Sequence, residues 1–224
     1  MGQGNRSRDM TMAATVIVTV ITAVTVVVTL AAGALATDTI GVTREGEATV
    51  RNAPDGNIVL IGMPASGKST LGVVLAKILG MRFVDMDIVI QTEQGATLQR
   101  LIDELGAEGF IAVENDALAR ACYENTVIAT GGSAVYSEEG MRHLASTGLV
   151  VYLHADVEAI RDRLGDTVER GVVFRSSSDH SIESLHAERA PLYERYADVT
   201  FDAGDLPLGE AARALADQLR ALAI

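Results

Sequence analysis

The pattern of apolar residues along the chain changes near residue 57. From there onward, short apolar runs alternate with stretches in which apolar residues recur every three or four positions. The short runs are typical of buried strands, and the spaced stretches are typical of helices with one buried face. Alternation of the two along one chain predicts a three-layer α/β domain, in which helices cover both faces of a parallel sheet.

The individual elements follow from the same pattern. The short runs predict strands over residues 57–61, 81–85, 126–129, 149–153 and 199–201. The spaced stretches predict helices over residues 70–79, 97–105, 107–123, 137–145, 156–164, a segment ending near 196, and 208–223. Between the last two strands, residues 170–181 show no periodicity and form the least regular segment of the domain.

The residues before this domain have a different composition. Residues 13–36 carry no charge and consist mainly of Val, Thr and Ala, a run long enough to cross a bilayer as a helix. Arg6 and Arg8 precede the run, so the positive-inside rule would place the following domain outside the cell. Residues 1–12 would be a short polar N-terminus and residues 37–56 a linker.

Two other interpretations of residues 13–36 compete with a transmembrane helix. The run could be a signal peptide, or the start codon could be assigned upstream of the true one. We favour the upstream start, because the run is low in complexity and contributes nothing that the following domain needs. On this view the chain contacts a membrane only if the segment is really translated.

A glycine-rich loop joins the first strand and the first helix of the domain. Residues 62–69 spell Gly-Met-Pro-Ala-Ser-Gly-Lys-Ser, which is the phosphate-binding loop pattern in its expected strand-to-helix context. Gly62 and Gly67 let successive backbone amides point at phosphate oxygens beside a helix N-terminus. Lys68 then reaches the outer phosphates, and Ser69 offers its hydroxyl to Mg²⁺. The loop therefore predicts that the chain binds ATP with Mg²⁺.

Two further polar motifs follow predicted strands. Asp85 and Asp87 come after the second strand, and Gly131 with Gly132 comes after the third. Ligands of open parallel sheets bind beyond the carboxyl ends of the strands, where these motifs and the phosphate-binding loop meet. We expect Asp85 to hold Mg²⁺ through water, Asp87 to orient the acceptor hydroxyl and the glycine pair to admit a substrate to the backbone. Solvated turn acids and a tight turn are the structural alternatives.

Arginines gather in and around the least regular segment. Phosphoryl transfer requires cations over the migrating group, and an arginine-bearing loop that closes after substrate binding is a common source of them. We expect Arg170 to cover the transition state. The surrounding candidates are Arg163, Arg175 and Arg189, the last of which precedes a proline on a predicted helix.

Composition limits the partners of this chain. The formal net charge is −12 and the isoelectric point is about 4.7. An acidic surface repels nucleic acid, so we expect no nucleic-acid partner. The single cysteine, Cys122, has no companion for a disulfide or a metal site.

Four motifs in this order resemble the shikimate kinase family, over about residues 57–222. The phosphate-binding loop matches through Thr70, and the strand-end Asp-x-Asp matches Asp85 and Asp87. The glycine-rich acceptor loop is similar to residues 129–135, and the late Glu-Arg-x-Pro-Leu-Tyr stretch matches residues 188–193.

The resemblance implies a P-loop fold with nucleoside-monophosphate-kinase-like topology and an ATP- and Mg²⁺-dependent kinase for a small hydroxylated metabolite. It also implies that Asp87, Gly132 and Arg189 lie at the acceptor, that Arg163 lies beside adenine and that Arg170 belongs to a closing lid. The expected nucleotide contacts are Gly62, Ala65, Ser66, Gly67, Lys68, Ser69, Thr70, Arg163 and Arg170. We expect a cytoplasmic kinase domain and a monomer.

Two departures from the family pattern concern the acceptor. The family's Phe-Arg-x-x-Glu, whose arginine helps to clamp the carboxylate of shikimate, is replaced by residues 110–114, in which Ile111 occupies the arginine position. The lid sequence Arg-Pro-Leu-Leu is replaced by residues 170–173, Arg-Gly-Val-Val, after which Arg175 could compensate for Ile111. Shikimate is the leading acceptor. A kinase for another hydroxy acid or hydroxy amino acid is one alternative, and a membrane-tethered nucleotide-binding regulator without turnover is the other.

Overall fold

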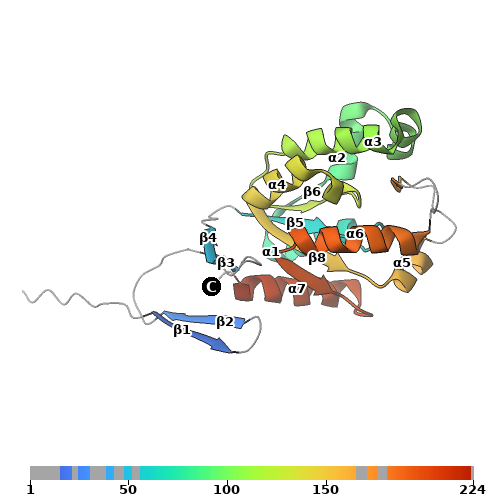
Figure 1. Ribbon diagram of the computed structural model, residues 1–224. Helices are drawn as coiled ribbons and strands as arrows, with labels where there is room; N and C mark the ends of the chain where they lie inside the picture. Colours follow the sequence, from blue (N-terminus) through green and yellow to red (C-terminus); the bar gives the residue numbers. More distant parts are fainter. Residues whose placement is uncertain are drawn as a thin grey trace, which may run out of the picture. The chain divides into compact units, whose positions relative to one another are not determined.

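The structure is a computed structural model, shown in Figure 1. It describes residues 16–21, 25–30, 39–42, 48–51, 56–164, 171–175 and 181–222, with side chains from residue 56 onward. The chain divides into two compact units, Met1–Ala36 and Thr37–Ile224.

A five-stranded parallel sheet is the centre of the larger unit, as the alternating pattern predicts (Figure 1). Its strands are β5 (Asn57–Ile61), β6 (Arg82–Asp85), β7 (Thr126–Ala129), β8 (Gly148–His154) and β9 (Val199–Asp202). Their order across the sheet is β6-β7-β5-β8-β9, and every neighbouring pair is parallel. The central position of β5 places the loop that follows it at the middle of the carboxyl edge.

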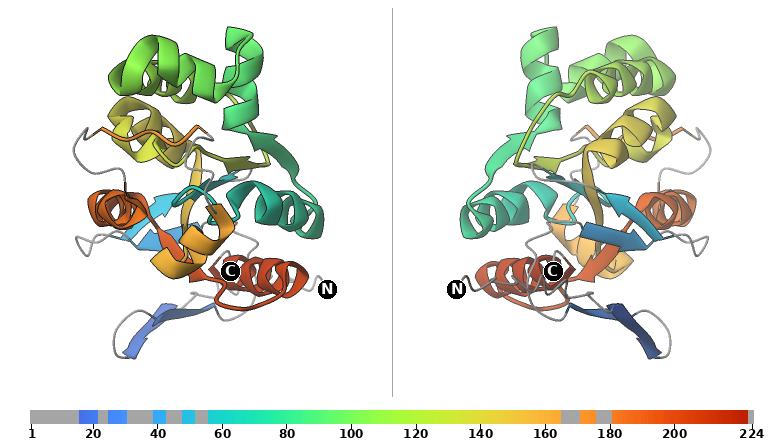
Figure 2. Two further views of the ribbon diagram at one scale, coloured as in Figure 1. Left: turned by 90° about the vertical axis from the view of Figure 1, so that its right-hand side faces the viewer. Right: turned by 90° about the vertical axis from the view of Figure 1, so that its left-hand side faces the viewer.

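Helices cover both faces of the sheet. They are α1 (Lys68–Leu79), α2 (Met86–Gln94), α3 (Leu98–Ala119), the short 3₁₀ helix η1 (Ala134–Tyr136), α4 (Glu138–Thr147), α5 (Val157–Leu164), α6 (Ile182–Tyr196) and α7 (Leu208–Leu222). Successive side chains of a strand point to opposite faces. Ile58 and Leu60 of β5 therefore pack with α1 and α7, whereas Val59 and Ile61 join the core under α3, α4 and α6. In Figure 2, α7 lies on the opposite side of the sheet from α3 and α4.

Two helical details differ from the prediction. Residues 86–94 form helix α2, which the sequence pattern did not predict. Residues 98–119 form one helical element in place of two, and Gly106 interrupts its helical backbone with φ 71° and ψ 175°. The break falls between the two helices that the sequence predicts, so the positions of both were close to correct.

A transmembrane helix, one of the interpretations of residues 13–36, is wrong for the residues that the structure describes there. β1 (Val16–Ile21) and β2 (Thr25–Leu30) form an antiparallel pair in the smaller unit. β3 (Thr39–Val42) and β4 (Ala48–Arg51) form a second antiparallel pair, in the segment expected to be a linker. Val and Thr are branched at Cβ and favour strands, which accounts for the difference. Among the described residues, no helix is long and apolar enough to cross a membrane.

Candidate active site

The loop between β5 and α1 has the backbone shape that the phosphate-binding pattern requires. Gly62 has φ 147°, and a Cβ atom there would lie 2.6 Å from the carbonyl oxygen of Leu153 on the neighbouring strand. Gly67 precedes the first turn of α1 with φ 95°. Both angles favour glycine, and the second glycine leaves the amides at the start of α1 open to an anion.

Lys68 is buried under this loop. Its Nζ donates to the carbonyl oxygens of Gly62 at 2.9 Å and Met63 at 2.8 Å. Burial lowers the pKa of Lys68 from 10.5 to about 8, although the charges of Asp87 and Asp85 act in the opposite direction. Within the described residues Lys68 forms no ion pair, so its positive charge remains available to an anionic ligand.

A cavity of about 570 Å³ lies over the loop. Its lining includes Ala65, Ser66, Gly67, Lys68, Ser69, Thr70, Asp87, Gly132 and Arg163. Arg163 reaches the loop from α5, where its Nη1 donates to the carbonyl oxygen of Ala65 at 3.4 Å. The fold therefore brings most of the expected nucleotide contacts to one cavity. Arg170 lies outside the described residues, and its role stays a prediction.

Asp85 ends β6, which pairs with β7, and Asp87 lies in the first turn of α2. Asp85 is the N-cap of α2 and accepts a hydrogen bond from the amide of Asp87 at 3.0 Å. Asp87 points into the cavity, where burial and the charge of Asp85 raise its pKa from 3.8 to about 6, while Lys68 lowers it. Because α2 begins between them, the two aspartates take different positions: Asp85 caps the helix and Asp87 faces the cavity.

A third carboxyl group, Glu114 of α3, lies beside Asp87. Both carboxyls approach the same side of Gly131, where an added Cβ would clash with Glu114 and lie 2.9 Å from Oδ1 of Asp87. Glu114 is fully buried, and neither oxygen has a hydrogen-bond partner within 3.5 Å among the described residues. Burial is the main cause that raises its pKa from 4.5 to about 7, and the charge of Asp87 adds to the shift. The Ser133 hydroxyl and the charges of Arg189 and Lys68 act against it.

Sequence reasoning assigned no role to Glu114. One signal was present, because Glu114 lies four residues after Phe110 and therefore on the same helix face as a buried aromatic residue.

Arg189 of α6 is a fully buried cation on the other side of the glycine pair. Its Nη2 donates to the carbonyl oxygen of Val173 at 2.6 Å, and its Nε donates to the Tyr136 hydroxyl at 3.2 Å. Its Nη1 would lie 3.0 Å from a Cβ on Gly132. Both hydrogen-bond partners are neutral, and no carboxylate among the described residues forms an ion pair with Arg189. A buried charge without a counter-ion is costly unless a ligand supplies one.

Comparisons with known proteins show which family this chain belongs to. The family model described as shikimate kinase matches residues 64–220. A shikimate kinase of Vibrio campbellii is 38% identical over 164 residues, which are 73% of this chain and 93% of that protein. This chain belongs to the shikimate kinase family. One from Francisella tularensis subsp. novicida is 39% identical over 148 residues, covering 65% of this chain and 84% of that protein.

Solved shikimate kinases share the fold. A structure of the Acinetobacter baumannii enzyme in complex with shikimate superposes with a TM-score of 0.67 at 28% identity, covering 76% of this chain and 95% of that one. The Aquifex aeolicus shikimate kinase has a TM-score of 0.61 at 30% identity, with 75% and 99% of the two chains covered. The match spans nearly the whole length of those kinases, so the larger unit contains a complete shikimate kinase fold.

The position at which the resemblance to the family predicts an arginine is buried here. Ile111 on α3 is 9% exposed and belongs to the apolar core. Glu108 and Glu114 lie three residues before and after it, and residues three apart are neighbours on a helix surface. An arginine at position 111 would thus stand beside both carboxyl groups. Its replacement leaves Glu114 without a cationic neighbour on its own helix.

Proposed function

We propose that this chain transfers the γ-phosphoryl group of ATP to a hydroxyl group of shikimate, giving shikimate 3-phosphate and ADP. The observation that carries the proposal is the distribution of buried charge in the site. Lys68 and Arg189 are buried cations without ion pairs among the described residues, and the carboxyl group of Asp87 lies in the same site. Lys68 can bind the phosphates of ATP, Asp87 can accept a hydrogen bond from the acceptor hydroxyl, and Arg189 can bind the carboxylate of the acceptor.

ATP fits the cavity over the loop. The amides at the start of α1, the Lys68 ammonium group and the exposed hydroxyls of Ser69 and Thr70 are the phosphate-binding groups there. Ser69 and Asp85 would hold Mg²⁺, an ion that prefers oxygen ligands and retains several waters. When bound, Mg²⁺ neutralises charge on the phosphate oxygens. Arg163, at the rim of the cavity, is our candidate for the contact with adenine.

Asp87 is the group that we assign to the acceptor hydroxyl. With a pKa of about 6 it is ionised at neutral pH, yet its basicity exceeds that of an exposed aspartate. It accepts the hydroxyl hydrogen and directs the oxygen towards the phosphate end of the cavity. The open backbone at Gly131 and Gly132 lets the acceptor approach closely, and Arg189 fixes its charged end.

Family membership does not favour the two alternatives raised by the sequence. The family model and the relatives described above are named shikimate kinase. A regulator without turnover would not need Lys68 and Asp87 at the same cavity. Because ATP is an intracellular substrate, we place the kinase unit in the cytoplasm.

Shikimate-dependent release of ADP by the full chain tests the proposal. We expect ADP to form with ATP, Mg²⁺ and shikimate, and to stay at background when shikimate is left out. Turnover with another hydroxylated acid but not with shikimate would contradict the proposed acceptor. ATP binding without turnover on any member of an acceptor panel would contradict a kinase function.

A further inference from the structure

The loss of the arginine at position 111 leaves the acceptor site short of one cation. A hydroxylated carboxylic acid needs donors for two carboxylate oxygens, and paired contacts from arginine are the usual solution. Arg189 has committed Nε and Nη2 to Tyr136 and Val173. A second arginine would therefore add donors that Arg189 lacks.

Arg175 is placed near the vacant position. Its Nε donates to Oε1 of Glu108 at 2.9 Å, and Glu108 lies on α3 one turn before Ile111. Glu108, Ile111 and Tyr136 also line a common shallow hollow of about 350 Å³. Arg175 thus approaches the same helix face that carries the arginine elsewhere in the family, but from the segment after α5.

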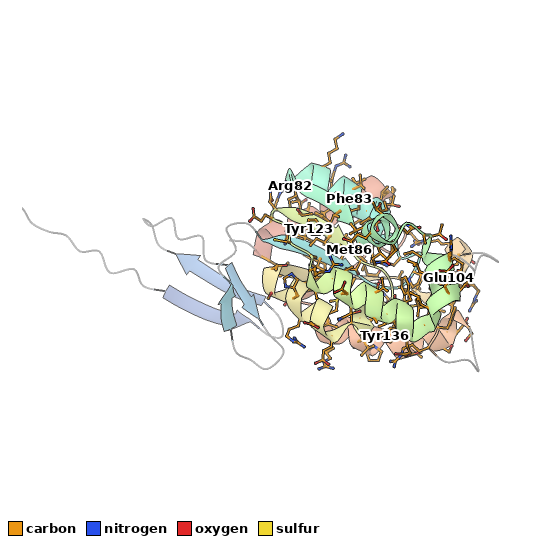
Figure 3. All side chains as sticks on the ribbon, turned by 90° about the horizontal axis from the view of Figure 1, so that it is seen from above. Arg82, Phe83, Met86, Glu104, Tyr123 and Tyr136 are labelled. Atoms are coloured by element: carbon orange, nitrogen blue, oxygen red, sulfur yellow. The ribbon has the colours of Figure 1, made fainter. Side chains whose placement is uncertain are left out.

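Tyr136 links Arg175 to the acceptor site. The ring of Tyr136, labelled in Figure 3, has the guanidinium carbons of both Arg175 and Arg189 at 5.1 Å from its centre. Such cation–π contacts orient a guanidinium group without using its hydrogen atoms. The Tyr136 hydroxyl also accepts from Nε of Arg189 at 3.2 Å, and η1, which carries Tyr136, contacts both α3 and α6.

The two Nη groups of Arg175 are available to donate hydrogen bonds to a ligand. Glu108 engages only Nε, and within the described part of the chain the Nη groups have no hydrogen-bond partner. The side chain is 46% exposed, so a ligand can reach it. A carboxylate can accept from these groups in the paired geometry that lysine or glutamine cannot offer.

We propose that Arg175 supplies the second carboxylate-binding cation of the acceptor site, in place of the arginine that Ile111 replaces. The proposal rests on the proposed function, because it assumes an acceptor with a carboxylate. It divides the site into an acidic end, at Asp87 and Glu114, that faces hydroxyl groups and a basic end, at Arg189 and Arg175, that faces the carboxylate.

Arg175→Gln tests this assignment in the full chain. Removing the charge but keeping a polar side chain should raise the Kd and the KM for shikimate about tenfold to a hundredfold, as expected for loss of a charge-assisted hydrogen bond. The KM for ATP and the kcat should change little. Arg142→Gln is the matched control, since Arg142 is an exposed arginine whose distance to Glu138 is 3.9 Å.

Two further comparisons separate binding from a structural role. Arg175→Gln should leave kcat/KM for the methyl ester of shikimate unchanged, because the ester lacks the negative charge. Adding Ile111→Arg to Arg175→Gln should restore most of the affinity for shikimate. If the double variant does not fold, the comparison of acid and ester decides alone.

The outcomes are distinct. Equal losses on shikimate and its ester, or no loss on shikimate, would overturn the role of Arg175. Calorimetric binding of shikimate without turnover would refute the proposed function, while the Kd values would still decide the role of Arg175. Absence of shikimate binding to the unaltered chain would overturn both.

Discussion

Glu114→Gln should change how the stability of this protein depends on pH. Glu114 is fully buried and has no hydrogen-bond partner among the described residues, and its pKa is raised from 4.5 to about 7. The folded protein therefore holds the Glu114 proton more tightly than the unfolded chain does. As the pH rises from 4.5 through 7, unfolding releases this proton, and the free energy of unfolding falls.

The magnitude follows from the two pKa values. One pKa unit corresponds to about 1.4 kcal/mol, so ionisation of Glu114 should remove roughly 2 to 3 kcal/mol of stability between pH 5 and pH 8. For a domain of this size, such a change corresponds to a shift of roughly 4 to 12 °C in Tm. Glutamine keeps the shape of the side chain but has no charge to bury, so this part of the pH dependence should disappear.

Thermal unfolding at a series of pH values, without ligands, measures the effect. The loss of Tm between pH 5 and pH 8 should be smaller in Glu114→Gln than in the unaltered protein by the amount given above. Glu104→Gln is the matched control, because Glu104 is an exposed carboxylate on the same helix. Asp87, whose pKa is also raised, should leave a residual decline in both proteins at lower pH.

Identical pH profiles for Glu114→Gln and the unaltered protein would refute the reasoning. That result would mean that Glu114 reaches water or a counter-ion in solution. An equal flattening in Glu104→Gln would show that net charge, and not this buried group, sets the slope.

Three further substitutions test the site. Lys68→Met should lower kcat by about a hundredfold or more with an unchanged circular dichroism spectrum, since it removes a cation aimed at the transferred group; unchanged kcat would exclude Lys68 from the mechanism. In the unaltered enzyme, kcat/KM for shikimate should fall below about pH 6 as Asp87 is protonated, and Asp87→Asn should lower the rate by roughly 10² to 10⁴ and abolish that step in the pH–rate profile. Gly131→Ala should destabilise the fold by roughly 1 to 3 kcal/mol, because the added methyl group would meet the carboxyl groups of Glu114 and Asp87. Gly209→Ala is the control and should not destabilise it, because the nearest atom to an added Cβ there, Nη1 of Arg213, lies at 3.8 Å. Equal Tm values for the two variants would contradict the packing around Gly131.

The parallel sheet and the phosphate-binding loop could be predicted because their signals are local. The apolar run at residues 58–61 is buried on both faces of the sheet. Gly62 and Gly67 have positive φ angles that favour glycine, so the glycines of the motif identify the loop in the sequence itself. Local signals gave an ambiguous prediction where one composition is compatible with two structures, a membrane helix and a pair of strands. Residues 16–30 are apolar enough for a membrane helix, but their Val and Thr content favours the strands that form there.

Other features depend on tertiary contacts that no sequence window contains. Glu114 is recognisable as buried by its spacing from Phe110, but its isolation depends on which groups surround it in space. Arg175 stands 64 residues from Ile111 along the chain, and only the fold brings it to Glu108 on the same helix face. Helix α2 was missed because Ile88, Val89 and Ile90 suggest no helical period, whereas Asp85 caps its first turn.

The central claim is that this chain moves a phosphoryl group from ATP to shikimate. Phosphorus NMR of the full chain with ATP, Mg²⁺ and shikimate tests it most directly, because the spectrum distinguishes a phosphate ester from inorganic phosphate. We predict that one phosphate monoester signal grows in step with ADP. Inorganic phosphate in place of the ester, or a spectrum that shikimate does not change, would contradict the account.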